Sequence, residues 1–334
     1  MSIQPINNKA TSSMPTRIIV SGLGGVGGYY GGLLAHYAQT HPEANVEVDF
    51  LMRSGTHFQK VQERGLLVKW PEGKIIAHPH RISQFASELA PANYLILATK
   101  SYNLRENIEQ IKPLLTANTV ILPLLNGLDV HDLLEELLPP EVIRWVGCVF
   151  ITSRRTEPGC IQSNSTYERL FMGLPNRNFP TERTPQENYL AALMKAAGIG
   201  VVVPDDPMDE VRKKYLMLSN SAAATAYLNT NVDGLVGQYR SFTEGLTQEL
   251  INLYQAKGWK VEDDAVEAAL RRIGRMPSGT TTSMHSDLQK GHTSEVESLV
   301  GYVVRESQKL GLSTPFFSEA YQGICANFSS QKSL

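Results

Sequence analysis

The hydrophobic pattern of the first half of the chain alternates between short apolar runs and longer amphipathic stretches. The runs have the length of buried strands, whereas the stretches between them repeat their apolar positions with the period of an α-helix. The predicted strands are residues 17–21, 46–52, 66–69, 94–98, 119–122 and 142–151, and the predicted helices are 25–38, 103–115 and 129–137. Strands that alternate with helices in this way predict a parallel, doubly wound sheet.

The pattern changes in the second half of the chain, where strands give way to helices. Apolar pieces at 160–162, 169–173 and 200–203 predict an antiparallel extension, with a helix at 186–197. From Asp206 onward the predicted elements are helices, at 208–228, 240–256, 264–273 and 294–310. The predicted fold class is α/β, with an N-terminal Rossmann-like doubly wound parallel sheet in residues 17–205 and a predominantly α-helical domain in residues 206–334.

The segment before the first strand, residues 1–16, is polar. We expect a disordered leader there, with either Met1 or Met14 as the start of the protein. The leader lacks the apolar core of a secretion signal, and no apolar run approaches the roughly 18 residues of a membrane span. These features predict a cytoplasmic protein outside the membrane.

Composition narrows the classes of partner. The 334 residues exceed what one hydrophobic core usually organises, and 42% hydrophobic residues suffice for two cores. The formal net charge is −2 and no basic run stands out, so we expect no nucleic acid or anionic membrane as partner. The three cysteines and eight histidines are too dispersed for a disulfide framework or a metal site, and we expect neither.

A glycine-rich turn joins the first predicted strand to the first predicted helix. Gly22, Gly24 and Gly27 fit the pattern G-x-G-x-x-G, in which glycines allow a tight turn, a close approach of the backbone to a pyrophosphate, and close packing of helix on strand. The free N–H groups of the helix N-terminus attract the same anion. The sequence therefore predicts a dinucleotide site whose phosphates contact Gly22, Leu23, Gly24, Gly25, Val26 and Gly27.

The residue at the tip of the second predicted strand indicates which dinucleotide binds. A carboxylate at this position would bond the ribose 2′-hydroxyl of NAD, whereas an arginine favours the 2′-phosphate of NADP. Arg53 stands there, and Asp49 lies four residues earlier, inside the strand. We therefore predict NADP(H) as the cofactor.

Two further strands end in polar residues. Lys100 follows the strand at 94–98, and Asn126 follows the strand at 119–122. Ligands of open α/β sheets gather at the carboxyl ends of the parallel strands. Lys100 is therefore a candidate cofactor ligand, and Asn126 is a candidate ligand of both nicotinamide and substrate.

These motifs together resemble the ketopantoate reductase (2-dehydropantoate 2-reductase) family. The resemblance begins with the glycine turn, Arg53, Thr99-Lys100-Ser101-Tyr102 and Asn126-Gly127-Leu128. It continues in Ser283-Met284-His285-Ser286-Asp287, which looks like the Ser-Met-x-x-Asp segment of the family. The run from Ser294 to Gly301 is similar to the family's Thr-Glu-Ile-Asp-x-Ile-x-Gly helix. The resemblance covers nearly the whole chain from Arg17 to about Pro315.

The resemblance implies that NADPH reduces the C2 carbonyl of a 2-oxo acid, namely ketopantoate to (R)-pantoate in pantothenate and coenzyme A biosynthesis. It assigns the general acid to a lysine on the first long helix of the second domain, which here is Lys214, or Lys213 if the register slips. An ammonium suits that role because hydride addition puts negative charge on the carbonyl oxygen. The resemblance also makes Glu295 a catalytic candidate, and Ser283 a ligand of the substrate carboxylate.

The chain departs from the family on that helix. The family has asparagines four and eight residues after the lysine, where this sequence has Leu218 and Ala222. Asn220 lies six residues after Lys214, off that face, and Ser221 lies nearer to it by the helical period. Either a register shift makes Asn220 a substrate ligand, or the pocket differs; we take Asn220 and Ser221 as candidate substrate ligands.

Three alternative functions stay open beside ketopantoate reduction. The pocket could favour another branched or more apolar 2-oxo acid. The protein could be a non-catalytic NADP(H)-binding regulator, or a dehydrogenase of the wider class with helical second domains. The sequence also leaves a homodimer possible.

Overall fold

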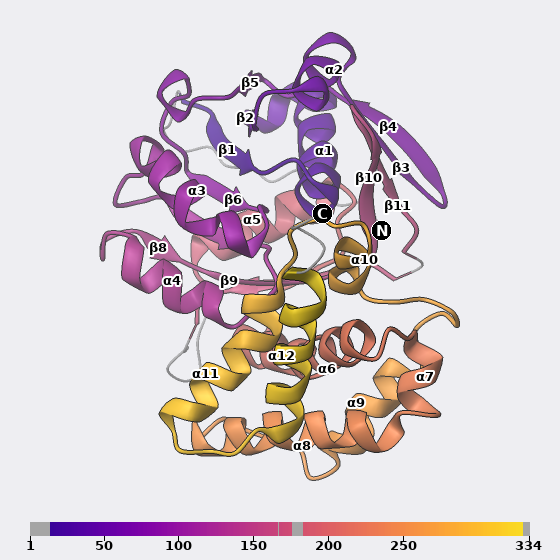
Figure 1. Cartoon of the computed structure of the whole chain (residues 1–334). Helices are drawn as coiled ribbons and strands as arrows, with labels where there is room; N and C mark the ends of the chain where they lie inside the picture. The colour runs from indigo at the N-terminus through magenta and orange to yellow at the C-terminus, as the bar shows by residue number, and fades with distance from the viewer. Residues whose placement is uncertain (1–13, 166, 176–182, 330–334) are drawn as a thin grey trace, which may run out of the picture.

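The computed structural model describes residues 14–165, 167–175 and 183–329. A six-stranded parallel sheet in the order β5-β2-β1-β6-β7-β8 forms its N-terminal half (Figure 1). The strands are β1 (Thr16–Ser21), β2 (Val46–Leu51), β5 (Arg81–Ser83), β6 (Tyr94–Leu97), β7 (Val120–Pro123) and β8 (Ile143–Arg144). The predicted parallel sheet is confirmed.

The alternation of side chains along β1 shows why helices cover both faces of this sheet. Ile18 and Val20 belong to the core that includes α1 (Gly25–Thr40), whereas Ile19, between them, belongs to the core beneath α3 (Leu104–Ile111) and α4 (Asp129–Leu137). Successive residues of a strand point to opposite faces, so both faces of a doubly wound sheet must be apolar. Further helices in this half are α2 (Thr56–Arg64) and α5 (Pro185–Ala196), with 3₁₀ turns at Pro42–Ala44, Ala86–Glu88, Ser101–Asn103 and Lys112–Leu114.

A four-stranded sheet packs against the outer side of α1, and one strand predicted for the parallel sheet belongs to it instead. Its order is β10-β11-β3-β4, formed by β3 (Leu66–Trp70), β4 (Gly73–Ala77), β10 (Ser153–Glu157) and β11 (Cys160–Ser163). The strand predicted at 66–69 exists, but it lies in this sheet and not in the parallel one. The reason is the surface of α1: a Cβ at Gly28 would lie 2.6 Å from Ile161, and a Cβ at Gly32 would lie 2.5 Å from Val68. These glycines leave room for a second sheet.

The strand predicted at 142–151 is two strands in different sheets. Its start is β8, and its end is β9 (Val146–Phe150), which joins a three-stranded sheet with β12 (Arg169–Gly173) and β13 (Val201–Val202). The antiparallel extension is correct in part, because β12 pairs antiparallel with β9 but parallel with β13. Three strands were not predicted from the sequence, namely β4, β5 and β10, because their short runs carry several polar residues.

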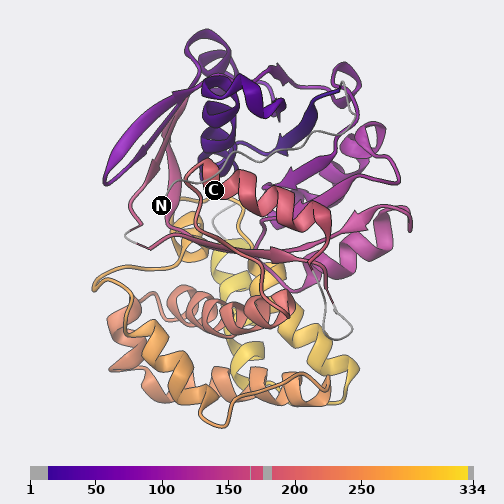
Figure 2. The same ribbon diagram turned by 180° about the vertical axis from the view of Figure 1, so that it is seen from behind.

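The C-terminal half is helical from Pro207 to Ser329, as predicted. Figures 1 and 2 both show α6 between the sheet-bearing half and α8. Its buried run Ala222-Ala223-Ala224 lets neighbouring helices approach closely. The helices are α6 (Pro207–Tyr227), α7 (Val232–Val236), α8 (Arg240–Ala256), α9 (Ala265–Ile273), α10 (Ser283–Gln289), α11 (Tyr302–Lys309) and α12 (Pro315–Ser329).

Two features of this half differ from the prediction. The sequence reading missed the short helices α7 and α10 and the C-terminal helix α12. The single helix predicted at 294–310 is present from Val296 to Lys309 without a break, but residues Glu297–Gly301 form a π-helical turn that leads directly into α11. Within the described residues, no helix combines the length and apolarity that crossing a membrane requires.

Candidate active site

The glycine turn between β1 and α1 has the geometry that a dinucleotide needs. Gly22 has a φ of +95°, and a Cβ there would lie 2.8 Å from the Ala98 carbonyl carbon on the neighbouring strand end. A Cβ at Gly27 would lie 2.0 Å from the Gly22 oxygen. At Gly24, the N-cap of α1, a Cβ would meet no atom within 4 Å, and no side chain caps the helix. The turn is therefore closely packed at Gly22 and Gly27 and leaves space for a phosphate at Gly24.

A buried histidine that the sequence reading missed holds this turn. Nδ1 of His57 accepts a hydrogen bond of 2.8 Å from the backbone N–H of Gly159, so Nε2 carries the proton and lies 2.9 Å from the Leu23 carbonyl oxygen. Burial lowers the pKa of His57, and the charge of Arg155 acts in the same direction. A neutral imidazole therefore ties the glycine turn to the β10–β11 hairpin. No sequence motif marks His57, because its partners are backbone groups distant in the chain.

Arg53 follows β2 as an exposed residue, and no hydrogen bond or ion pair engages it within the described part of the chain. Asp49 is fully buried inside β2 and lies 3.1 Å from Nδ1 of His80, with Arg17 on its other side. Burial raises the pKa of Asp49, against the opposing effects of His80 and Arg17. The arginine is thus available to a ligand, whereas the aspartate is engaged within the fold.

Lys100 connects the two halves of the chain. Its Nζ lies 3.1 Å from Oδ2 of Asp287 on α10 and 3.5 Å from Oε2 of Glu295, which is buried. Burial by itself would lower the pKa of Lys100, but the two carboxylates outweigh it and raise that pKa. Glu295 also accepts a long hydrogen bond of 3.4 Å from the backbone N–H of Ser101. The predicted residues Lys100 and Glu295 are therefore in contact.

The second contact across the halves joins the predicted Lys214 and Asn126. Nζ of Lys214 donates a hydrogen bond of 2.8 Å to Oδ1 of Asn126 and lies 5.7 Å from the centre of the Phe150 ring. Burial lowers the pKa of Lys214, while the nearby Cys148 and Glu295 act in the opposite direction. Its neighbour Lys213 pairs with Asp209 at 2.8 Å on the outer side of α6. Of the two lysines, only Lys214 reaches the strand ends.

The π-helical turn after Glu295 is held by hydroxyl groups of α6. A π-helix shifts the backbone hydrogen bonds to i→i+5, so nearby donors can serve its carbonyl groups. Tyr215 donates to the oxygens of Ser298 and Leu299 at 2.8 and 3.1 Å, and Ser219 donates to Leu299 at 2.6 Å. Ser298 in turn donates 2.7 Å to Oδ2 of Asp129 at the start of α4, three residues after Asn126. The same helix thus supplies Lys214 and fixes the segment after Glu295.

The three remaining predicted ligands lie elsewhere or are engaged. Asn220 is fully buried, and its amide donates 2.9 Å to Thr247 on α8, away from the face of Lys214. Ser221 shares the face of Lys214, but its hydroxyl donates 2.8 Å to the Met217 oxygen. Ser283 is exposed and is the first residue of α10.

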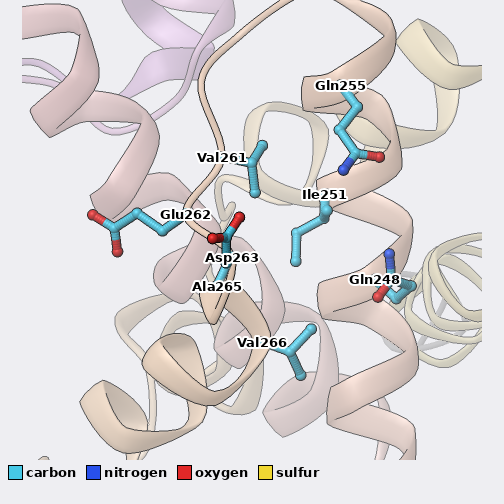
Figure 3. Close-up of a pocket in the computed structure, with 8 residues that line it drawn as sticks. All are labelled: Gln248, Ile251, Gln255, Val261, Glu262, Asp263, Ala265 and Val266. Atoms are coloured by element: carbon cyan, nitrogen blue, oxygen red, sulfur yellow. The ribbon is translucent and has the colours of Figure 1, made fainter.

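A surface hollow of about 280 Å³ lies outside this group of residues, between α8, α9 and the segment that joins them (Figure 3). Gln248, Ile251 and Gln255 line it from α8, and the residues that line it from the other side are Val261, Glu262, Asp263, Ala265 and Val266. None of the predicted site residues lines it. The hollow is therefore separate from the candidate active site.

Comparisons with known proteins find relatives that match most of the chain. Two family models match, "Ketopantoate reductase PanE/ApbA" over residues 18–177 and "Ketopantoate reductase PanE/ApbA C terminal" over residues 206–326. The chain is 26% identical to an uncharacterized oxidoreductase, YkpB, of Bacillus subtilis (strain 168), over 92% of this chain and 97% of that protein.

Solved structures share the fold. The crystal structure of 2-dehydropantoate 2-reductase from Porphyromonas gingivalis W83 is 32% identical, with a TM-score of 0.80, over 92% of this chain and 99% of that one. D-mandelate dehydrogenase in its ternary structure with NADH and anilino(oxo)acetate is 20% identical, with a TM-score of 0.80, over 95% of this chain and 100% of that one. The chain therefore belongs to the ketopantoate reductase family, whose reaction is the reduction of a 2-oxo acid with a nicotinamide cofactor.

Proposed function

We propose that this protein reduces a branched 2-oxo acid to the 2-hydroxy acid with NADPH, and that Lys214 is the general acid. The observation that carries the proposal is the 2.8 Å contact between the Lys214 ammonium and Asn126. This contact brings a proton donor from α6 to the carboxyl ends of the parallel strands, where a cofactor of an open α/β sheet lies. The charge of Glu295 acts on Lys214, and Glu295 in turn lies 3.5 Å from Lys100.

The residues present fit NADPH. The open space at Gly24 and the uncapped N-terminus of α1 suit a pyrophosphate, and the unpaired Arg53 suits a 2′-phosphate. We propose that Gly22 to Gly27 bind the pyrophosphate and that Arg53 binds the 2′-phosphate. Lys100 and Asn126 would lie nearer the nicotinamide end of the cofactor. The structural relative with bound NADH supports a nicotinamide cofactor in general, and Arg53 is our reason for preferring NADPH.

The chemistry needs one hydride and one proton. A bound NADPH would supply the hydride that C2 of the acid accepts, with NADP⁺ as the other product. Negative charge then develops on the carbonyl oxygen, and the Lys214 ammonium stabilises that oxygen and gives it a proton from Nζ. Asn126 orients the ammonium by accepting one of its three hydrogens, so the other two remain for substrate. Burial of Lys214 assists the transfer, because it lowers the pKa of the amine and makes the ammonium a stronger acid.

The substrate has two candidates. The family relation favours 2-dehydropantoate, the reaction that would serve pantothenate and coenzyme A biosynthesis. A branched 2-oxo acid without a hydroxyl group is the second candidate, because Leu218 stands one helical turn from Lys214. We further propose a boundary between the two domains at Asp205 and Asp206, a cytoplasmic location and a homodimer as the form to test.

The first experiment follows the loss of NADPH absorbance with purified protein and a panel of 2-oxo acids that includes ketopantoate. We expect turnover of at least one branched acid. Its rate with NADH should be lower at equal concentration. Binding of NADPH with no turnover of any acid would contradict the proposal and favour a non-catalytic regulator.

Replacing the general acid should abolish most turnover. We expect Lys214→Ala to lower kcat by about 10²- to 10⁴-fold, the usual contribution of a general acid. Affinity for NADPH, measured by titration of the cofactor's fluorescence, should change little. Lys213→Ala is the matched control and should leave kcat within about twofold, because Lys213 pairs with Asp209 at the surface.

The pH profile provides a second readout for the same lysine. Reduction needs the ammonium, so kcat should fall as pH rises through the pKa of Lys214. Since burial lowers that pKa, the fall should occur below the pH at which an exposed lysine titrates. The reverse oxidation needs the neutral amine and should increase over the same range. Wild-type turnover by Lys214→Ala, or a flat profile, would exclude the assignment.

Arg53→Ala should weaken NADPH binding far more than NADH binding. Loss of a charge-assisted contact costs about 1.5–3 kcal/mol, which corresponds to roughly a 10- to 100-fold rise in Kd. Titration of each cofactor against wild type and variant measures the two effects. Arg64→Ala, a change of the same kind at the end of α2, is the control. Equal losses for NADPH and NADH would contradict a 2′-phosphate contact.

His57→Phe should weaken the binding of both cofactors. The substitution retains an aromatic ring but leaves the Gly159 N–H and the Leu23 oxygen without their partner, at a cost of about 1–3 kcal/mol. Urea unfolding should show that cost in stability, and the Kd values for NADPH and NADH should increase in parallel. An unchanged Kd, with lower stability, would mean that His57 supports the fold without positioning the turn.

A further inference from the structure

Hydrogen bonds and short stretches of backbone close a contact ring around the candidate general acid. Nζ of Lys214 donates to Oδ1 of Asn126 at 2.8 Å, and in the same turn Oδ2 of Asp129 accepts 2.7 Å from the Ser298 hydroxyl. The carbonyl oxygen of Ser298 accepts 2.8 Å from the hydroxyl of Tyr215, the residue after Lys214. The contact ring thus returns to α6, and its bonds at Asn126 and at Asp129 both cross between the two halves of the chain.

The turn from Asn126 to Asp129 packs against the helical half along its whole length. A Cβ at Gly127 would lie 2.4 Å from Oδ1 of Asp129 and 3.2 Å from Cβ of Ser298. Leu128 is buried, and it belongs to the core of the helical half. The position of the Asn126 amide is therefore set by contacts that the next three residues make across the halves.

Asp129 and Lys214 respond to different neighbouring charges. Burial is the largest influence on both, and it raises the pKa of Asp129 and lowers the pKa of Lys214. The groups whose charges act on them are Arg305 on α11 and Asp132 on α4 for Asp129, and Cys148 on β9 and Glu295 for Lys214. Asp129 can therefore affect the ammonium through geometry, by way of its bond with Ser298.

We propose that Asp129 is a positioning residue, which holds the Asn126 amide against the Lys214 ammonium through its hydrogen bond with Ser298. The inference rests on the proposed function, because it takes Lys214 to be the proton donor. A closed contact ring orients the donor before a substrate binds, so less ordering remains to be done during the reaction. Glu295, three residues before Ser298, is held in place by the same segment.

Removing either partner of the bond between Asp129 and Ser298 should lower kcat. We expect Asp129→Ala and Ser298→Ala each to lower it by about 10- to 100-fold with the best acid of the panel, because a displacement of about 1 Å can cost that much. The double variant should lose little more than the weaker of the two single variants, since both changes open the same contact ring. The Kd for NADPH should stay at its wild-type value.

The pKa of Lys214 gives a readout that a merely structural role would not change. Loss of the Asn126 oxygen removes an acceptor from the ammonium, so kcat should decline at a pH about one unit lower than in the wild type. The NMR signal of the Lys214 side chain, in protein made with isotope-labelled lysine, measures the same pKa without any substrate. The loss of that signal in Lys214→Ala assigns it.

Two variants separate the hydrogen bond from charge and from helix stability. Asp129→Asn retains an oxygen that accepts from Ser298, and it should restore most of kcat and the wild-type pKa of Lys214. Asp132→Ala removes an exposed carboxylate from the first turn of the same helix, outside the contact ring. It should leave kcat within about twofold of the wild type. Urea unfolding reports the stability of each variant.

The outcomes distinguish this inference from the proposed function. A wild-type pKa of Lys214 in both Asp129→Ala and Ser298→Ala, at lower stability, overturns the inference, and so do losses of kcat that multiply in the double variant. Absence of turnover with every 2-oxo acid overturns the proposed function, and the NMR titration then still decides the positioning. Should Asp129→Ala not fold, Ser298→Ala decides it, because that change removes only a hydroxyl group.

Discussion

The arrangement of the site depends on one constraint, the need to hold the Lys214 ammonium in an apolar surrounding without losing its charge. Burial favours the neutral amine, and the structure offsets this with the oxygen of Asn126 and the nearby charge of Glu295. Asn126 follows β7, and Glu295 lies just before the π-helical turn, so the position of each must be fixed separately. Gly127, with a φ of +115°, permits the turn after Asn126, and the hydroxyls of Tyr215 and Ser219 fix the π-helical turn after Glu295.

The two halves of the chain therefore meet through polar groups as well as through packing. Lys100 reaches Asp287 and Glu295, and Asp129 accepts from Ser298. Interfaces between domains that contain such contacts are often mobile, and substrate closure commonly completes an active site. Of the two carboxylates that Lys100 contacts, Glu295 is buried but Asp287 is partly exposed, so a ligand phosphate or carboxylate can replace the contact with Asp287 at modest cost. In the proposed reaction, that exchange would couple ligand binding to the approach of the two halves.

The sequence predicted the features that local patterns encode. The glycine turn, the strand ends with Lys100 and Asn126, and the helix that carries Lys214 follow from motif and period, whereas the choice of Lys214 on that helix came from the family resemblance. Features that depend on distant partners were missed. The strand at 66–69 joined a second sheet because Gly28 and Gly32 open the surface of α1, and helix period alone does not show which face meets a sheet. His57 escaped notice because it binds backbone atoms, and Asn220 was expected at the site although its amide faces α8.

The departure at Leu218 makes physical sense once the charge state of Lys214 is considered. An apolar wall beside an ammonium excludes water, and this strengthens the attraction between the ammonium and an oxygen that gains negative charge. An amide at the same position would add a hydrogen bond to a hydroxylated substrate but would raise the local polarity. The carboxylate of a 2-oxo acid that binds at Lys214 would add a negative charge that favours protonated Lys214. Binding of such a substrate would thus favour the protonated form of Lys214, which burial disfavours, and would prepare the general acid for proton transfer.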